Sequence, residues 1–201
     1  MTADRQTLAA YEARADDYLR LTASTKPHKS LQEFMDELPA GAKVLDIGCG
    51  PGTESAHMRA AGLSPDPFDA SESMVKHARD TFNLPARIAT FDEIAGDSAY
   101  DGAWANFSLL HADPSRLPQH ISAIAKALRP DGLFHIAMKT GSGVRRDTLG
   151  RLYAYLSVSE LKDLLIQSGL IPVHIHEGES LGLEGNQEPF IAIRARKVTD
   201  A

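Results

Sequence analysis

Residues 44–52 of the 201-residue chain read Val-Leu-Asp-Ile-Gly-Cys-Gly-Pro-Gly, and this stretch decides the fold. Its apolar residues predict a buried strand, and its glycines predict a turn into a helix that begins near Thr53. Glycine lets a backbone approach a ligand closely and adopt positive φ. Asp69 follows 17 residues after the last glycine. A strand, a glycine turn and a helix followed by an acid is an arrangement that holds a nucleoside, with the acid on the ribose hydroxyls.

The spacing of the glycines indicates which nucleoside is bound. A dinucleotide fingerprint, G-x-G-x-x-G, would place its third glycine at position 53, where this chain has threonine. The pattern here is G-x-G-x-G, and with its leading acid the string DIGCGPG resembles motif I of the class I S-adenosylmethionine (SAM) methyltransferases. The resemblance implies that SAM contacts Asp46, Gly48, Gly50 and Gly52.

The similarity to this family covers residues 40–170, and residues 68–74 (Phe-Asp-Ala-Ser-Glu-Ser-Met) resemble its second motif. The implied role of Asp69 is hydrogen bonding to both ribose hydroxyls, with Ala70, Ser71 and Met74 beside it. Alternatively, the Asp69 carboxylate only stabilises the start of the following helix through the helix dipole.

Residues 90–94 (Thr-Phe-Asp-Glu-Ile) fall where the family usually places the acid that meets the adenine amino group. Thr90 stands at that position, which is a departure from the family pattern. Adenine recognition is then expected to use Thr90, the backbone of Phe91 and stacking, or Asp92 reaching back. Phe91 can equally be a core residue.

Residues 100–111 resemble the fourth-strand segment of small-molecule methyltransferases, including the tellurite-resistance-like group. The family implies that Asn106 and Phe107 border the methionine part and the methyl group of SAM. The Asn-Pro-Pro-Tyr type of sequence used on planar amides is absent, which disfavours a DNA adenine or protein glutamine acceptor. His111 is the candidate general base, because a histidine here can take a proton from a hydroxyl or amine. Its alternative role is structural.

Two further segments are expected near the methyl acceptor. Residues 139–155 are glycine-rich, basic and aromatic and resemble an acceptor lid. The cations of this segment indicate an anionic substrate, and a solvated surface loop is an equally good interpretation. Tyr11 and Tyr18 lie on one face of an N-terminal helix and can cover a sulfonium or pack in the core. The candidate acceptor-binding residues are Tyr11, Tyr18, Lys139, Arg145, Arg151 and Tyr153.

From residue 43 the hydrophobic pattern alternates between strand and helix, which predicts a doubly wound, mostly parallel α/β sheet. Expected strands are 43–47, 65–69, 86–90, 101–107, 132–138, 172–177 and 189–196, and the last two form an antiparallel pair. Helices are expected at 2–22, 53–61, 71–81 and 115–128. Capping boxes at Ser30–Glu33 and Ser157–Glu160 start two more, and residues 129–132 form a turn. We expect one domain over 1–201, with a helical cap at 1–40 and the α/β core at 41–201.

Composition narrows the class of protein. The single cysteine, Cys49, excludes an internal disulfide framework and a multi-cysteine zinc site, and His174 and His176 lack a third ligand, so no metal is expected. A net charge of −6 disfavours a general nucleic-acid surface. No apolar run approaches the ~20 residues that span a bilayer. With no signal-peptide core near its start, the chain is expected to be cytoplasmic.

These features favour a SAM-dependent methyltransferase acting on a small molecule. The alternative is a SAM-binding regulator or inactive partner subunit, which the glycines and Asp69 do not distinguish from an enzyme. A nicotinamide-dependent oxidoreductase is disfavoured by the glycine spacing and by the missing substrate domain. The sequence does not indicate an oligomeric state.

Overall fold

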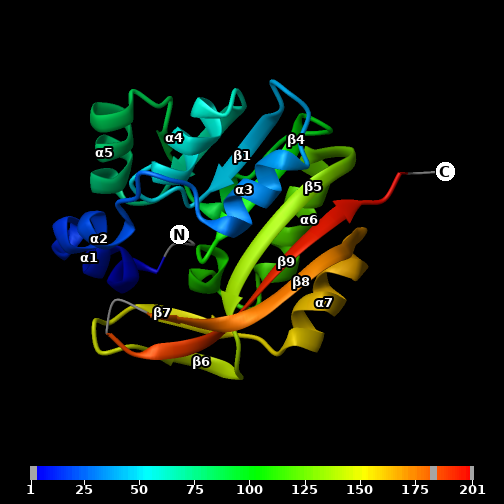
Figure 1. Cartoon of the computed structure of the whole chain (residues 1–201). Helices are drawn as coiled ribbons and strands as arrows, with labels where there is room; N and C mark the ends of the chain where they lie inside the picture. Colours follow the sequence, from blue (N-terminus) through cyan, green and yellow to red (C-terminus); the bar gives the residue numbers. More distant parts are fainter. Residues whose placement is uncertain (1–3, 182–184, 200–201) are drawn as a thin grey trace.

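A seven-stranded sheet organises the molecule, with strand order β3-β2-β1-β4-β5-β9-β8. The computed structural model describes residues 4–181 and 185–199. The first five strands in this order are mutually parallel, β9 is antiparallel to both of its neighbours, and a separate antiparallel pair is formed by β6 and β7 (Figure 1). The predicted doubly wound sheet with a terminal antiparallel pair is confirmed. The strands are β1 (Lys43–Ile47), β2 (Ser64–Asp69), β3 (Arg87–Ile88), β4 (Tyr100–Asn106), β5 (Leu128–Lys139), β6 (Gly143–Arg146), β7 (Leu152–Tyr155), β8 (Leu170–Leu181) and β9 (Gln187–Lys197).

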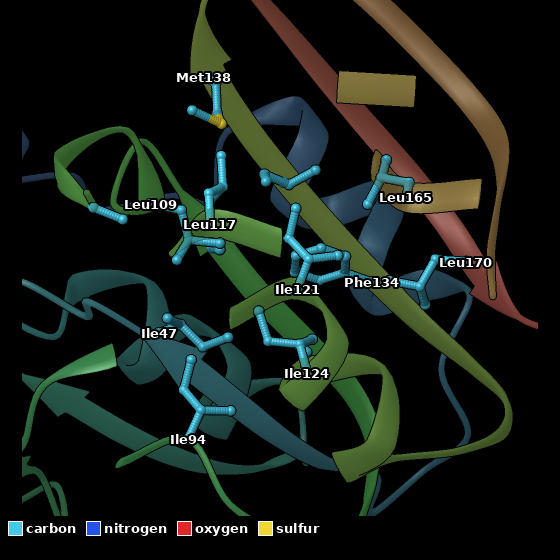
Figure 2. Packing of buried hydrophobic residues seen from close by; sticks show 14 of the residues in the cluster. Ile47, Ile94, Leu109, Leu117, Ile121, Ile124, Phe134, Met138, Leu165 and Leu170 are labelled. Atoms are coloured by element: carbon cyan, nitrogen blue, oxygen red, sulfur yellow. The ribbon is translucent and has the colours of Figure 1, made fainter. Parts of the chain in front are cut away.

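Helices cover both faces of the sheet. Phe34 and Met58, from the helices before and after β1, pack on one face around the buried Trp104. Ile121 and Leu165 lie in the larger cluster on the other face, with Phe134 of β5 (Figure 2). The α-helices are α1 (Arg5–Ala13), α2 (Ala15–Thr22), α3 (Lys29–Asp36), α4 (Thr53–Ala60), α5 (Glu72–Phe82), α6 (Leu117–Ala127) and α7 (Val158–Gln167), with 3₁₀ turns η1 (Phe91–Glu93) and η2 (Leu109–His111). None of the helices in the described residues has the length and apolar character needed to cross a bilayer.

The N-terminal region differs from the single helix predicted over 2–22. Residues 1–3 lie outside the described part, and the remainder forms two helices, because Arg14 leaves the helical conformation with φ −125° and ψ 25°. The Ser30–Glu33 capping box was wrong as well. α3 begins before Ser30, and its cap is His28, whose Nδ1 accepts a hydrogen bond from the Leu31 amide.

The strand expected at 86–90 is only two residues long, and the cause lies in β2. The Ser64 amide points toward β1, and successive residues of a strand point their backbone groups to opposite edges. Pro65 and Pro67 therefore face β3, and as prolines they have no amide hydrogen to donate. The edge of β2 that faces β3 therefore lacks donors until Asp69. Pairing with β3 is accordingly limited to Phe68 and Asp69.

Two other differences concern turns. The turn expected at 129–132 lies inside the bounds of β5, where Asp131 has φ 63° and the pairing with β4 jumps from Leu128 to Leu133. The segment 139–155, expected as a lid, contains the β6–β7 hairpin. The capping box at Ser157 is confirmed, with the Ser157 amide donating to Glu160 Oε2 at 2.7 Å.

Candidate functional site

Two adjoining cavities open where β1, β2 and β4 end. The first is about 90 Å³ and is lined by the glycine turn, the ends of β2 and β4, η1 and α1. The second is about 350 Å³ and lies between the glycine turn, α2, the start of α4 and the β6–β7 hairpin. Both are bordered by Tyr11, Tyr18, Gly48, Gly50, Asn106, Phe107 and His111. This shared wall is a place where two bound molecules would meet.

The glycine turn is held tightly against its neighbours. The amides of Gly48 and Cys49 both donate to the Phe68 carbonyl at 2.9 Å. Gly48 has φ +70°, and a Cβ there would lie 2.5 Å from Cβ of Ser108, which packs behind it. Gly50 has φ +53° and faces the Tyr18 ring. Positive φ and the absence of a side chain are therefore both required at Gly48.

Asp69 lies at the tip of β2 on the border of the first cavity. Its two carboxylate oxygens accept hydrogen bonds from the amides of Gly50 and Ser71, each at 2.9 Å. Burial raises the pKa of Asp69 and these amides oppose the shift. Each oxygen keeps a lone pair, so the carboxylate can still accept from two hydroxyls. Ala70, Ser71 and Met74 line the same cavity, and Ser71 caps α5.

The far end of the first cavity contains Thr90 and Phe91. Both donors of Thr90, its amide and its hydroxyl, are used by the Glu93 carboxylate at 2.7 and 3.0 Å. Phe91 borders the cavity and also packs against the core, and its part in adenine binding stays a prediction. Asp92 lies outside the lining of both cavities and forms an ion pair with Arg116 at 2.8 Å.

Two residues of motif I support the site from behind. The Asp46 carboxylate is buried and accepts a 2.6 Å hydrogen bond from the Ser55 hydroxyl of α4. Burial, together with the negative charge of Glu54, raises the pKa of Asp46 to about 8. Gly52 caps α4 with φ +86°, and a Cβ there would meet Ala78 and Leu84 at 2.8 Å. Neither residue lines a cavity, so their contact with a cofactor stays a prediction.

Glu54 is a site residue that the sequence reasoning missed. It lies in the first turn of α4 and borders the second cavity. Its carboxylate accepts from Trp104 Nε1 at 2.6 Å, from Asn106 Nδ2 at 2.8 Å and from His28 Nε2 at 2.8 Å. Glu54 thereby fixes Asn106 at the shared wall. Its position two residues after the last glycine, at a helix start that favours an acid, was the available signal.

Tyr11 and His111 meet at the shared wall. The Tyr11 hydroxyl lies 2.8 Å from His111 Nε2, and His111 Nδ1 lies 2.7 Å from the Leu152 carbonyl oxygen. A carbonyl only accepts, so Nδ1 carries the hydrogen and Nε2 accepts from the tyrosine. Burial lowers the pKa of His111 to about 4, so the ring is neutral at physiological pH. The ring of Tyr18 contacts Tyr11 edge to face at 5.3 Å.

Three of the four basic residues of 139–155 form ion pairs. Arg151 forms an ion pair with Asp147 at 2.6 Å, Arg146 with Asp4 at 2.7 Å and Lys139 with Glu188. The guanidinium of Arg145 lies 4.3 Å over the Tyr155 ring, and Arg145 does not line either cavity. Lys139, Arg151 and Tyr153 do line the second cavity. Because Lys139, Arg146 and Arg151 each have a carboxylate partner, their charges are weaker evidence for an anionic substrate.

Comparison with known proteins identifies the family. The chain belongs to the methyltransferase-domain family, whose sequence model matches residues 18–174. The family resemblance inferred from motif I is thereby confirmed.

Among curated relatives, the malonyl-[acyl-carrier protein] O-methyltransferase of Erwinia pyrifoliae is 30% identical over 142 residues, which is 65% of this chain and 50% of that protein. The chain spans about half the length, or less, of the first curated relatives it matches.

Two solved structures share the fold. The 1,6-didemethyltoxoflavin-N1-methyltransferase of Burkholderia thailandensis, solved with S-adenosylhomocysteine, has a TM-score of 0.73 at 22% identity, covering 96% of this chain and 88% of that one. TehB of Haemophilus influenzae has a TM-score of 0.74 at 18% identity, covering 90% of this chain and 66% of that one. At these identities the likeness concerns the fold alone.

Proposed function

We propose that this protein is a SAM-dependent methyltransferase that binds SAM in the first cavity and a small-molecule methyl acceptor in the second. The observation that carries the proposal is the shared wall of the two cavities, from Tyr11 to His111. Methyl transfer is an in-line displacement, so cofactor and acceptor must meet end to end with no protein group between them. Two cavities that share lining residues support this arrangement, because molecules bound in them would lie next to each other.

Each part of an adenosyl sulfonium has a candidate partner among the residues present. The molecule is larger than the first cavity alone and would extend along the shared wall. The ribose would lie against Asp69, whose carboxylate has lone pairs left for two hydroxyl donors. Gly48 and Gly50 present bare backbone to the ligand, and Phe91 offers an apolar surface for a base. The methionine part would pass Asn106 and Phe107 at the shared wall.

When bound, SAM supplies a methyl group on a positively charged sulfur. The chain's own residues align the acceptor and exclude water, which can contribute on the order of 7–11 kcal/mol. Tyr11 and Tyr18 place electron-rich rings where the positive charge would lie. Among the described residues, no cluster of three candidate ligands could hold a metal, and the proposed reaction uses none. A small-molecule acceptor and a cytoplasmic location stay proposals based on the sequence.

Calorimetry with SAM and with NAD tests the cofactor, and formation of S-adenosylhomocysteine separates an enzyme from a SAM-binding regulator. Asp69→Asn should weaken SAM binding by at least ~10-fold, because about 1.4 kcal/mol is lost with one charge-assisted hydrogen bond. Asp66→Asn is the matched control on the same strand, because Asp66 faces Tyr100 and Arg87, away from both cavities. Preferential binding of NAD, or equal SAM affinity in both variants, would refute the assignment.

A further inference from the structure

The hydrogen bonds around Tyr11 and His111 define a direction for proton movement. Because the Leu152 carbonyl fixes the hydrogen of His111 on Nδ1, the lone pair of Nε2 points at Tyr11. Tyr11 therefore donates its hydroxyl hydrogen to His111. Nε2 is thus already occupied by the tyrosine, and a bound acceptor could pass a proton to the imidazole through the Tyr11 oxygen.

The Tyr11 hydroxyl oxygen has one hydrogen-bonding position left. A phenol oxygen donates one hydrogen bond and accepts up to two. Its donor is used by His111, and one acceptor position faces Nη1 of Arg151 at 3.4 Å. The remaining position can only accept a hydrogen. Since Tyr11 borders both cavities, a molecule in the second cavity that carries a hydrogen on its nucleophilic atom can fill it.

We propose that Tyr11 and His111 form a proton relay, and that the methyl acceptor is a hydroxyl compound, with its O–H donating to Tyr11 Oη. This inference rests on the proposed function and names its substrate class. A carboxylate acceptor is already ionised, so it has no proton for the relay to take up. An ammonium acceptor has no free lone pair on its nitrogen and cannot attack the methyl carbon while it is protonated.

The step balances in atoms and charge. The hydroxyl oxygen forms a bond to the methyl carbon, and the carbon–sulfur bond breaks with its electron pair left on sulfur. The hydroxyl proton moves to Tyr11 Oη while the original Tyr11 proton moves to His111 Nε2. The products are the methyl ether, S-adenosylhomocysteine and an imidazolium. The positive charge passes from sulfur to the ring, so the net charge of the site does not change during the transfer.

The surroundings of His111 keep its ring neutral before the reaction. Its ring contacts Tyr153 at 4.7 Å and Tyr11 at 5.5 Å. Burial lowers its pKa most, and the charges of Arg151 and Lys139 lower it further. The hydrogen bond to the Leu152 carbonyl and the charge of Asp147 oppose this shift. A ring that is neutral before the reaction is free to accept. In this relay Tyr11 touches the acceptor and is the catalytic residue, while His111 acts through it.

The test compares two phenolic acceptors, phenol and 4-nitrophenol, and uses benzylamine and benzoate to represent other classes of nucleophile. Phenol keeps its proton at neutral pH, whereas 4-nitrophenol is largely ionised by about pH 9 and needs no base. Wild type should methylate phenol. It should leave unmethylated both benzylamine, which is an ammonium ion at neutral pH, and benzoate, which is a weaker nucleophile than a phenolate. In Tyr11→Phe, kcat for phenol should fall by ~100-fold, the size typical of general base catalysis. The loss for ionised 4-nitrophenol should stay within about threefold, because no proton remains to be moved.

If Tyr11 had only a structural role, Tyr11→Phe would lower kcat for phenol and for 4-nitrophenol by the same factor. The ratio of these two losses is therefore the deciding quantity. His111→Gln, which keeps a polar side chain but cannot take up the proton, should show the same ratio. Tyr100→Phe is the control for losing a tyrosine hydroxyl elsewhere, since Tyr100 bonds to Asp66 away from both cavities. SAM binding by calorimetry is measured on every variant. If SAM binds to wild type but phenol is not methylated, or if both acceptors lose equally in Tyr11→Phe, the relay is overturned while the cofactor assignment stands.

Discussion

The carboxylate of Asp4 accepts two hydrogen bonds from the guanidinium of Arg146, at 2.9 and 2.7 Å. Asp4 is the N-cap of α1, so this pair joins α1 to the β6–β7 hairpin. Two further contacts run parallel to it. The Leu152 amide donates to the Thr7 hydroxyl at 2.8 Å, and Arg151 contacts Tyr11. The hairpin and α1 therefore cover the cavities as one unit, although 142 residues separate the two partners of the ion pair. Figure 1 shows α1 and α2 beside this hairpin at one end of the sheet.

Arg146→Met should loosen this unit without unfolding the protein. Exposed ion pairs contribute little to global stability, so the melting temperature should change little. Amide hydrogen exchange over residues 143–155 should instead become several-fold faster, because local opening has lost a restraint. Lys76→Met, which removes an exposed ion pair with Asp80 on α5, is the control and should leave that exchange unchanged. Equal exchange in all three proteins would mean that the hairpin is held by its other contacts alone.

The ion pair between Asp4 and Arg146 should break only at strongly acidic pH. The hydrogen bond from Arg146 holds the pKa of Asp4 well below its ordinary value of 3.8. A carboxylate with a lowered pKa in the folded state stabilises that state above its ordinary pKa, and the contribution is lost as the pH falls through the lowered value. Hairpin exchange, corrected for its intrinsic pH dependence, should therefore be flat from neutral pH down to about pH 4.

Gly48 and Gly62 form a matched pair for the steric demand of the glycine turn. Both have positive φ, +70° and +84°, but a Cβ meets Ser108 at 2.5 Å only at Gly48, and nothing within 4 Å at Gly62. Left-handed φ costs a non-glycine residue ~1–2 kcal/mol, so Gly62→Ala should lose about that much. Gly48→Ala should lose more than ~2 kcal/mol by denaturant unfolding, because overpacking is added. Equal losses would show that Ser108 can move aside.

Much of the fold could be predicted from local pattern. The alternation of strand and helix gave the sheet, and the glycine turn with Asp69 gave the site at the end of β1. The shortness of β3 depends on which edge of β2 the prolines face, which is settled only once the register with β1 is known. The β6–β7 hairpin was missed because β6 is Gly-Val-Arg-Arg, which lacks strand alternation, and β7 is only four residues long. Asp4 and Arg146 stabilise it from across the chain.

In the candidate site, too, the sequence motifs predicted some residues, and tertiary contacts decided the rest. Motif spacing placed Asp69, Asn106, Phe107 and His111 around the cavities, but their partners come from distant segments. Glu54 had no motif of its own, and its importance comes from three donors that fold around it. Whether a cation is free or paired also depends on tertiary contacts. Lys139 and Arg151 looked available in the sequence, and each has a carboxylate partner in the structure.

Asp46 should make the folded state less stable as the pH rises. Burial raises its folded-state pKa to about 8 from 3.8, so the folded protein keeps a proton that the unfolded chain releases. Its contribution is fully present below the ordinary pKa and is lost as the pH rises toward 8, with a limiting slope of ~1.4 kcal/mol per pH unit. In a protein of this size each kcal/mol shifts the melting temperature by ~2–4 °C.

Asp46→Asn carries no such proton. The difference in melting temperature between the wild type and this variant should therefore move in favour of the variant between about pH 5 and pH 8. Taking the difference cancels the other titrating groups common to both proteins. A pH-independent difference would mean that Asp46 is ionised in the folded state throughout.

Glu54→Gln should be destabilising and should be visible in fluorescence. The carboxylate accepts three hydrogen bonds, and an amide of the same shape turns a donor toward at least one of them. Trp104 is fully buried, so leaving its Nε1 hydrogen unpaired costs ~1–3 kcal/mol. Because Trp104 is the only tryptophan in the chain, its emission reports on this one contact. Glu72→Gln is the control, since Glu72 also lies in a first helical turn, that of α5, but is exposed. If Glu54→Gln kept the wild-type emission and unfolding free energy, Asn106 and Trp104 would have to be held in place by packing alone, and the shared wall would not depend on α4.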